Sequence, residues 1–175
     1  MPTNGDCMVR LRKLEEKDVP FMLEWMHDEE TREIFQANFA DMSEKDVKAF
    51  IADSFCEKHK HFAIVDERDE YLGTISLKNI DMKNSNAEYA ISTRKVMRGT
   101  SASKEATKLL LEYAFCELDL HRVYLCVLCS NIRARKFYEK VGFQYEGTFK
   151  EHLFQNGIYQ DLLWYGITSE YYECN

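Results

Sequence analysis

Apolar and polar positions along the chain repeat with two different periods. Apolar residues at every second position are typical of strands, and apolar residues three and four positions apart are typical of helices. The strand pattern predicts strands over residues 8–14, 62–66, 71–80, 87–92, 122–128, 143–149 and 159–167. The helix pattern predicts helices over residues 18–26, 43–55, 101–118 and 131–141, with a further acidic turn or two over 28–35.

The order of these elements predicts a single α/β domain with a mixed sheet. A strand, a long amphipathic helix and another strand follow one another over residues 87–128. Such a unit crosses over in the right-handed sense and requires at least one parallel pair of strands. The apolar run 122–128 is expected to be buried on both faces. We expect the domain to cover residues 8–168, with short tails at 1–7 and 169–175.

The best-defined local element is the helix over 131–141. Asn131 is suited to cap its first turn or to bond a ligand, and Gly142 suits the left-handed position that ends a helix. Phe143 then begins a new strand, and Tyr138 lies about two turns into the helix. The same local reasoning makes Asp18 and Ser43 the N-caps of the two earlier helices.

Composition narrows the class of protein. The 175 residues are 45% hydrophobic and 30% charged, as in soluble globular domains. No apolar run approaches the ~20 residues of a membrane span, and the polar N-terminus lacks the apolar segment of a secretion signal. We therefore expect a cytoplasmic protein with no membrane partner. The net charge of −7 argues against nucleic-acid binding and suits a cationic substrate, although it also serves ordinary solubility.

The six cysteines are expected to be free thiols in a reducing compartment. Cys126 and Cys129 form a CxxC pair, but no second pair stands at ligand spacing. We therefore expect no metal site.

The loop before the helix at 101–118 is a candidate phosphate site. The first turn of a helix exposes unpaired N–H groups and carries partial positive charge. Arg94, Lys95 and Arg98 add cations next to this helix end. The residues alone fit a phosphate site and a serine-capped helix with solvated basic residues equally well.

Together these segments resemble the Gcn5-related N-acetyltransferases (GNAT). The run Asn131–Phe143 is similar to the family helix that ends in Tyr-Glu-Lys-x-Gly-Phe. The run Arg98–Ser103 matches the family's Gln/Arg-x-x-Gly-x-Gly/Ala loop, with serine in place of both glycines. Leu120–Leu125, Glu146–Glu151 and Asn156–Asp161 resemble the branch that acts on spermidine, on nucleotide-linked amino sugars and on ribosomal protein N-termini.

The resemblance implies a GNAT-like domain that uses acetyl-CoA as co-substrate. It has a mostly antiparallel sheet, with a parallel pair at the coenzyme site and helices on its flanks. In this family an amine attacks the thioester directly. Tyr138 matches the general acid, and the alternative is a tyrosine that simply packs beside Phe137. Glu88, or a water that it orders, stands where relatives carry the base, and the alternative is a surface glutamate in an ion pair.

The resemblance also implies which residues bind the coenzyme. The backbone of the strand around 91–93 would bond the pantetheine arm, the loop 98–103 the pyrophosphate, and the start of the helix at 131 the pantetheine and the adenosine phosphate. The residues expected at the coenzyme are Ile91, Ser92, Thr93, Arg98, Gly99, Thr100, Ser101, Ala102, Ser103, Asn131, Arg133 and Lys136.

The acceptor is less defined. Asp28, Glu29 and Glu33 belong to an acidic cluster that suits a polycation, and a solvated acidic helix is the other interpretation. We expect a small amine such as a polyamine or a nucleotide-linked amino sugar. The alternatives are a protein N-terminus and a non-catalytic coenzyme A-binding module. Relatives often form homodimers or larger homo-oligomers, for which the two closing strands are suited.

Overall fold

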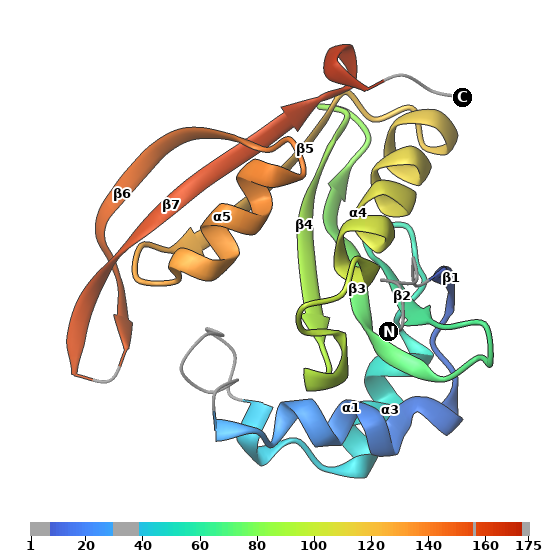
Figure 1. The fold of residues 1–175 in the computed structure, drawn as a ribbon. Coiled ribbons are helices and arrows are strands. Elements are labelled where there is room, and N and C mark those ends of the chain that lie inside the picture. Colours follow the sequence, from blue (N-terminus) through green and yellow to red (C-terminus); the bar gives the residue numbers. More distant parts are fainter. Residues whose placement is uncertain (1–7, 30–38, 156, 173–175) are drawn as a thin grey trace, which may run out of the picture.

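The computed structural model describes residues 8–29, 39–155 and 157–172, which contain one seven-stranded sheet in the order β1-β2-β3-β4-β5-β7-β6 (Figure 1). The strands are β1 (Arg10–Lys13), β2 (Lys60–Val65), β3 (Tyr71–Asp81), β4 (Asn86–Thr93), β5 (Arg122–Leu128), β6 (Gln144–Gln155) and β7 (Ile158–Thr168). The β4–β5 pair is parallel and the other neighbours are antiparallel, which confirms the predicted mixed sheet.

The four α-helices described lie on both sides of this sheet. They are α1 (Val19–Met26), α3 (Glu44–Ala52), α4 (Ala102–Glu112) and α5 (Ile132–Lys140). Short 3-10 turns occupy Glu16–Asp18, Phe39–Asp41, Lys95–Met97 and Ser169–Tyr171, and a π-helical turn occupies Tyr113–Glu117. The helix predicted over 101–118 is therefore α4 continued by the π-helical turn. The helical turns predicted over 28–35 lie outside the described residues from position 30 on.

The starts of α1 and α3 differ in whether a side chain caps the helix. Ser43 caps α3 as predicted, because its hydroxyl accepts a hydrogen bond from the Asp46 N–H at 3.3 Å. Asp18 stands at the start of α1 but does not cap it with its side chain, so that prediction is wrong. Its buried carboxylate instead receives two hydrogen bonds from the Arg12 guanidinium, at 2.7 and 2.8 Å. An ion pair between β1 and the helix start has replaced the cap.

Alternation along the strands divides the core into two layers. On β2, Phe62 and Ile64 belong to the cluster that packs against α4, whereas Ala63 and Val65 belong to the cluster under α1 and α3. Successive residues of a strand point to opposite faces, so the two clusters cover the two faces of the sheet. The sheet is thus held between α4 on one side and α1 with α3 on the other.

Strand β5 departs from the prediction of burial on both faces. Val123, Leu125 and Val127 are buried, but the alternate residues Tyr124 and Cys126 are only half-buried. Tyr124 stacks on Trp164 of β7, and Cys126 lines a cavity. The continuous apolar sequence of β5 thus belongs to a strand with one buried face and one half-buried face.

The parallel pair is short, and this shapes the centre of the molecule. Only Asn86, Ala87 and Glu88 of β4 pair with β5. Beyond Glu88, β4 stays on β3 as far as Thr93, while β5 follows β7 (Figure 1). The sheet therefore splits into two halves that are joined at one end and open at the other.

The cysteines fit the sequence prediction only in part. Cys56, Cys126 and Cys129 are free thiols. The prediction is wrong for Cys116, which is disulfide-bonded. Within the described residues, no helix is both long and apolar enough to span a membrane.

Gly73 allows β3 and β4 to approach closely, and its replacement gives a test of this packing. A Cβ atom there would lie 2.5 Å from the Ser92 carbonyl oxygen, so the two strands would have to move apart. We expect Gly73→Ala to lower the free energy of unfolding by about 2 kcal/mol, as overpacking does. Urea unfolding measures this.

Gly147→Ala is the matched control, because nothing lies within 4 Å of a Cβ at that strand position. It should change the stability by less than about 0.5 kcal/mol. Equal losses in the two variants would contradict the proposed strand contact.

Candidate active site

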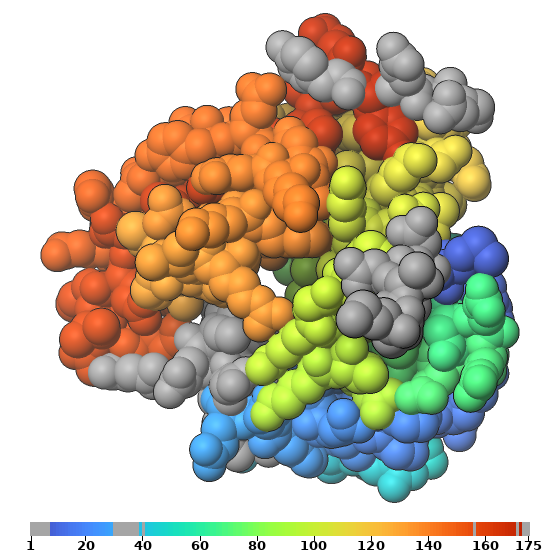
Figure 2. Space-filling model, in the orientation of Figure 1, coloured from blue at the N-terminus to red at the C-terminus, as the bar shows by residue number. Residues whose placement is uncertain are grey.

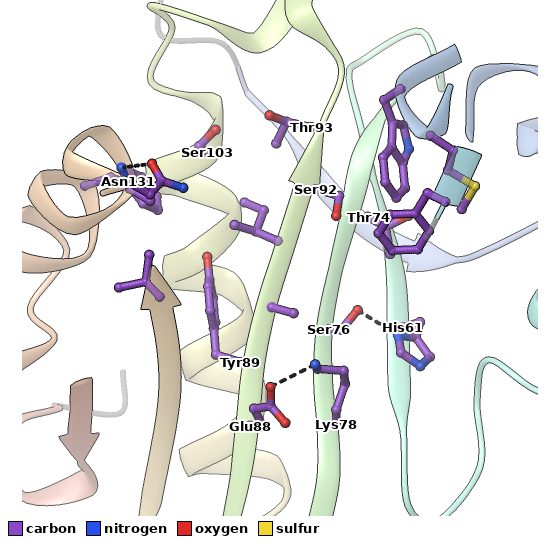
Figure 3. Close-up of a pocket in the computed structure, with 18 of the residues that line it drawn as sticks. His61, Thr74, Ser76, Lys78, Glu88, Tyr89, Ser92, Thr93, Ser103 and Asn131 are labelled. Carbon is purple, nitrogen blue, oxygen red and sulfur yellow. Dashed lines mark hydrogen bonds and ion pairs between the residues drawn. The ribbon is translucent and has the colours of Figure 1, made fainter. Parts of the chain in front are cut away.

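A cavity of about 630 Å³ occupies the region where the two halves of the sheet part. Its walls come from α1, β3, β4, β5, α5 and the start of α4. In the space-filling view the surface is hollowed between the orange half of the molecule and the yellow-green segment that precedes α4 (Figure 2). Ten of the lining residues are labelled in the close-up (Figure 3).

One side of the cavity is suited to an anionic, elongated ligand. Arg98 reaches it from the loop before α4, and Ser103 reaches it from the first turn of α4. Asn131 and Arg133 reach it from the start of α5. Asn131 also caps α5, because its Oδ1 accepts a hydrogen bond from the Ala134 N–H at 3.1 Å. Two helix N-termini and two guanidinium groups give this side a positive potential.

The other residues predicted in the phosphate loop lie around this wall. Gly99 has a φ of 78°, which glycine adopts without strain, and the Thr100 hydroxyl donates to the Met97 carbonyl at 2.8 Å. Ser101 precedes α4, and Ala102 begins it. These four residues and Lys136, which is exposed on α5, are not among the residues that line the cavity.

Two of the cations predicted beside the loop serve the fold instead. Arg94 pairs with Glu24 at 3.0 Å and Glu70 at 2.7 Å, and its guanidinium lies over the Phe21 ring. Lys95 pairs with Asp28 at 3.0 Å. The sequence left open whether these two cations belong to a phosphate site, and in the structure carboxylates on neighbouring elements pair with both.

The edge of β4 that faces the gap carries main-chain groups. Ile91, Ser92 and Thr93 line the cavity and pair on their other side with β3. Because β5 has already turned away, the N–H and C=O groups on this edge have no strand partner among the described residues. An extended ligand can bond to them as an added strand would.

Tyr138 reaches the cavity from α5. Its ring packs edge-to-face on Tyr89, with centroids 5.9 Å apart, and also contacts Phe143. Burial raises the pKa of Tyr138 above its ordinary value, and the nearby Cys126 adds to the effect. The phenol therefore keeps its proton at neutral pH and can donate it to an anion that forms in the cavity.

Glu88 lies at the last paired position of β4 and also lines the cavity. Its Oε1 accepts a hydrogen bond from Lys78 Nζ at 2.8 Å (Figure 3). Its Oε2 accepts one from Asn79 Nδ2 at 2.9 Å. Both carboxylate oxygens are thus engaged. Each oxygen can accept a second hydrogen bond, so a substrate amine can bond to the carboxylate beside these donors or in place of one of them.

The residues predicted to bind the acceptor are placed differently. Asp28 is held by its ion pair with Lys95, and Glu29 is exposed. Neither is among the residues that line the cavity. Glu33 lies outside the described residues.

Polar residues that the sequence analysis did not select line the same cavity. They are His61 on β2 and Thr74, Ser76 and Lys78 on β3. Thr74, Ser76 and Lys78 occupy alternate positions and so share one face of β3, which is the pattern that could have revealed them. In the described residues, no group of three or more His, Cys, Asp or Glu side chains is placed to hold a metal ion.

Comparison with known proteins agrees with this geometry. A family model described as an acetyltransferase (GNAT) domain matches residues 9–144. Spermidine N(1)-acetyltransferase of Escherichia coli K12 is 29% identical over 162 residues, which cover 89% of this chain and 83% of the relative. The Vibrio cholerae spermidine N(1)-acetyltransferase is 32% identical over 103 residues, 59% of this chain, and this match spans only 60% of the relative.

A solved structure of spermidine N-acetyltransferase from Vibrio cholerae, in complex with CoA and spermine, superimposes with a TM-score of 0.85 at 25% identity. The superposition covers 93% of this chain and 96% of that one. The chain belongs to the GNAT acetyltransferase family. It is an N-acetyltransferase whose co-substrate is acetyl-CoA.

The buried imidazole of His61 predicts a specific loss of stability in acid. Burial lowers the pKa of His61 to about 4; charge interactions with His59 and Lys78 add to the shift, and Asp53 opposes it. An unfolded chain binds this proton below about pH 6.5, so stability falls as the pH drops from about 6.5 to about 4 and is unaffected above that window. The shift corresponds to about 3 kcal/mol.

His61→Asn removes the titration while its amide can still bond Ser76. We expect this variant to lose about 3 kcal/mol less than the unmodified protein between pH 7.5 and pH 4. Urea unfolding at both pH values measures the difference. Equal losses would show that His61 titrates normally in the folded protein.

Proposed function

We propose that the enzyme moves an acetyl group from acetyl-CoA to the primary amine of a small molecule, with Tyr138 as general acid and Glu88 as base. The observation that carries this proposal is the shared cavity. Tyr138 on α5, and Glu88 with the edge of β4 that follows it, all line this cavity, although the two elements are far apart in the chain. This is the arrangement that direct transfer between two bound substrates requires.

The coenzyme end is assigned to the positive side of the cavity. The pyrophosphate would lie at the start of α4 near Arg98 and Ser103, where helix N–H groups and a guanidinium favour an anion. The pantetheine arm would follow the free edge of β4 at residues 91–93, with Asn131 on the opposite wall. Arg133 lines this side too, and Lys136 is available from the exposed face of α5.

The acid step follows from the environment of Tyr138. When the amine nitrogen bonds to the thioester carbon, the carbon–sulfur bond breaks and the electron pair leaves with the sulfur. The thiolate is formed in the same poorly solvated cavity, which disfavours its charge. The Tyr138 hydroxyl, kept protonated by burial, then transfers its proton to the sulfur. The acylated nitrogen loses its second proton as the neutral amide forms, and an equivalent proton restores the phenol.

The base step is assigned to Glu88, directly or through one water. The amine arrives as an ammonium and must lose one proton to attack. Lys78 and Asn79 hold the carboxylate in a fixed position, at the point where β4 and β5 part. The ammonium can displace Lys78 from Oε1, and the proton then passes to the carboxylate.

The acceptor class is a small amine. The relatives described above include spermidine acetyltransferases, so a polyamine is one candidate, and a nucleotide-linked amino sugar is the other. The roles of Asp28, Glu29 and Glu33 in acceptor binding, the domain limits 8–168 and the cytoplasmic location stay predictions.

We also propose that the protein forms a homo-oligomer. The β6–β7 hairpin exposes a row of large apolar side chains, namely Tyr145, Phe149, Phe154, Ile158 and Tyr159. Several large apolar side chains exposed on one hairpin are suited to contacts between subunits. One solved relative is a dodecameric spermidine N-acetyltransferase.

The first test of the function is acetyl-CoA binding and turnover by the unmodified protein. We expect calorimetry to detect acetyl-CoA binding at micromolar concentrations and a thiol-release assay to detect transfer to at least one member of a panel of spermidine, amino sugars and short peptides. No binding at millimolar acetyl-CoA would exclude the enzymatic proposal. Binding without transfer to any acceptor would favour a coenzyme A-binding module.

Two variants separate the acid from the base. Tyr138→Phe removes only the hydroxyl and should lower kcat about 100-fold while acetyl-CoA affinity changes less than about twofold. Glu88→Gln should lower kcat/KM at neutral pH by a similar factor, with partial recovery at high pH, where the free amine is already abundant. Steady-state kinetics from pH 6 to 10 and calorimetry measure both effects.

Tyr145→Phe is the matched control, because that exposed hydroxyl bonds Thr148 outside the cavity. It should leave the kinetics unchanged. A Tyr138→Phe variant with normal kcat would remove Tyr138 as the acid, and a Glu88→Gln variant with a normal pH profile would remove Glu88 as the base.

A further inference from the structure

Three buried polar side chains form one end of the cavity, on the side of β3 away from the coenzyme wall. His61, Ser76 and Thr74 are 8%, 4% and 7% exposed, and all three line the cavity (Figure 3). Buried polar groups cost free energy unless they are hydrogen-bonded. Their placement on a cavity wall therefore points to a role in binding.

The His61–Ser76 pair presents both a donor and an acceptor. His61 Nδ1 lies 2.7 Å from Ser76 Oγ, across paired positions of β2 and β3. If Nδ1–H donates to Ser76, the serine hydrogen and the Nε2 lone pair are left over. If Ser76 donates to Nδ1, Nε2–H and a serine lone pair are left over. A neutral imidazole thus leaves one donor and one acceptor in either arrangement.

The imidazole is held in place and kept neutral. The Phe50 ring packs on it with centroids 4.7 Å apart, and among the described residues Nε2 has no hydrogen-bond partner and is not a fully buried atom. Burial and the nearby cation of Lys78 lower the pKa of His61 to about 4, with His59 adding to the shift and Asp53 opposing it. The pair is therefore uncharged at neutral pH.

Thr74 adds a further donor. Trp25 Nε1 donates to Tyr71 Oη at 3.0 Å, and Tyr71 Oη lies 2.7 Å from Thr74 Oγ1. Since Tyr71 is 1% exposed and has Thr74 as its other described partner, the Tyr71 hydrogen goes to Thr74. The hydrogen of the Thr74 hydroxyl is not used in this bond. Because Thr74 lines the cavity, the hydroxyl can donate this hydrogen to a bound ligand.

We propose that His61, Ser76 and Thr74 bind a neutral hydroxyl or amide group of the acceptor, so that the substrate is a small amine with such a group at its far end. This inference rests on the proposed function and narrows its acceptor class. A hydroxyl or an amide both donates and accepts, which matches the pair, whereas a second ammonium only donates.

A series of linear amines tests this inference. Each member has a primary amine at one end and a methyl, hydroxyl, carboxamide or ammonium group at the other, separated by two to six carbons. Calorimetry measures the binding of each amine to the protein saturated with CoA, which requires no turnover. At the best length, the hydroxyl or carboxamide amine should bind about tenfold more tightly than the methyl amine, and the ammonium amine should not.

Two variants assign the preference to the pair. His61→Phe and Ser76→Ala should each reduce the tenfold preference to about twofold or less, where the preference is the affinity ratio of the hydroxyl or carboxamide amine to the methyl amine in the same variant. Ser54→Ala is the matched control, since Ser54 is equally buried but bonds the Ile51 carbonyl outside the cavity. Circular dichroism and thermal unfolding verify that each variant is folded.

The outcomes are distinct. Tighter binding of the ammonium amine, a preference that survives both variants, or no binding of any amine would overturn the inference. Preference for the hydroxyl amines points to a sugar-like acceptor, and preference for the carboxamides points to a peptide-like one; both support it. The proposed function fails separately, if the amines bind as expected but thiol release from acetyl-CoA stays at the background rate.

Discussion

The short parallel contact between β4 and β5 is the constraint on which the rest of the structure depends. Pairing ends at Glu88 because β4 remains hydrogen-bonded to β3 while β5 follows β7. The next residue, Tyr89, is buried and contacts the helices on both sides of the split between β4 and β5. Its hydroxyl lies 2.8 Å from Thr107 Oγ1 on α4, and its ring contacts Tyr138 on α5. One side chain thus ties both helices to the strand at the point where the sheet splits. The split exposes a main-chain edge inside the protein, which would be costly unless a ligand bonds to it.

The cavity that results has two chemically different ends. The starts of α4 and α5, with Arg98 and Arg133, make one end positive. The other end is lined by uncharged polar groups and by apolar side chains of α1 and α3, such as Met22 and Phe50. Between them lie a phenol that burial keeps protonated and a carboxylate held by Lys78. Low hydration strengthens each of these interactions, and it also raises the free-energy cost of a polar or charged group that has no partner. An anionic coenzyme and a small amine acceptor can therefore be kept apart by electrostatics while their reacting atoms meet at the split.

Prediction from the sequence succeeded where a feature is local. The helix at 131–141 was read correctly because Asn131 and Gly142 act through bonds within a few residues of themselves, and α5 is capped as expected. The sequence could not decide the roles of Arg94 and Lys95, because their partners Glu24, Glu70 and Asp28 lie on other elements and are distant in sequence. His61 was not selected at all, since a single histidine in an apolar strand carries no pattern of its own.

The sequence by itself determined the elements, their order, the parallel pair and the family, because periodicity, capping residues and turn residues act over short distances. It also brought out Tyr138 through the motif around it. Only the tertiary structure decided which polar groups meet. The pairing of Glu88 with Lys78 and of His61 with Ser76 depends on strand register, and register is set by the packing of whole sheets against helices. The same packing decided that Asp18 binds Arg12 instead of capping a helix. Interactions between residues close in sequence determine the helices and strands. Burial and charge pairing between distant residues determine which side chains contact one another.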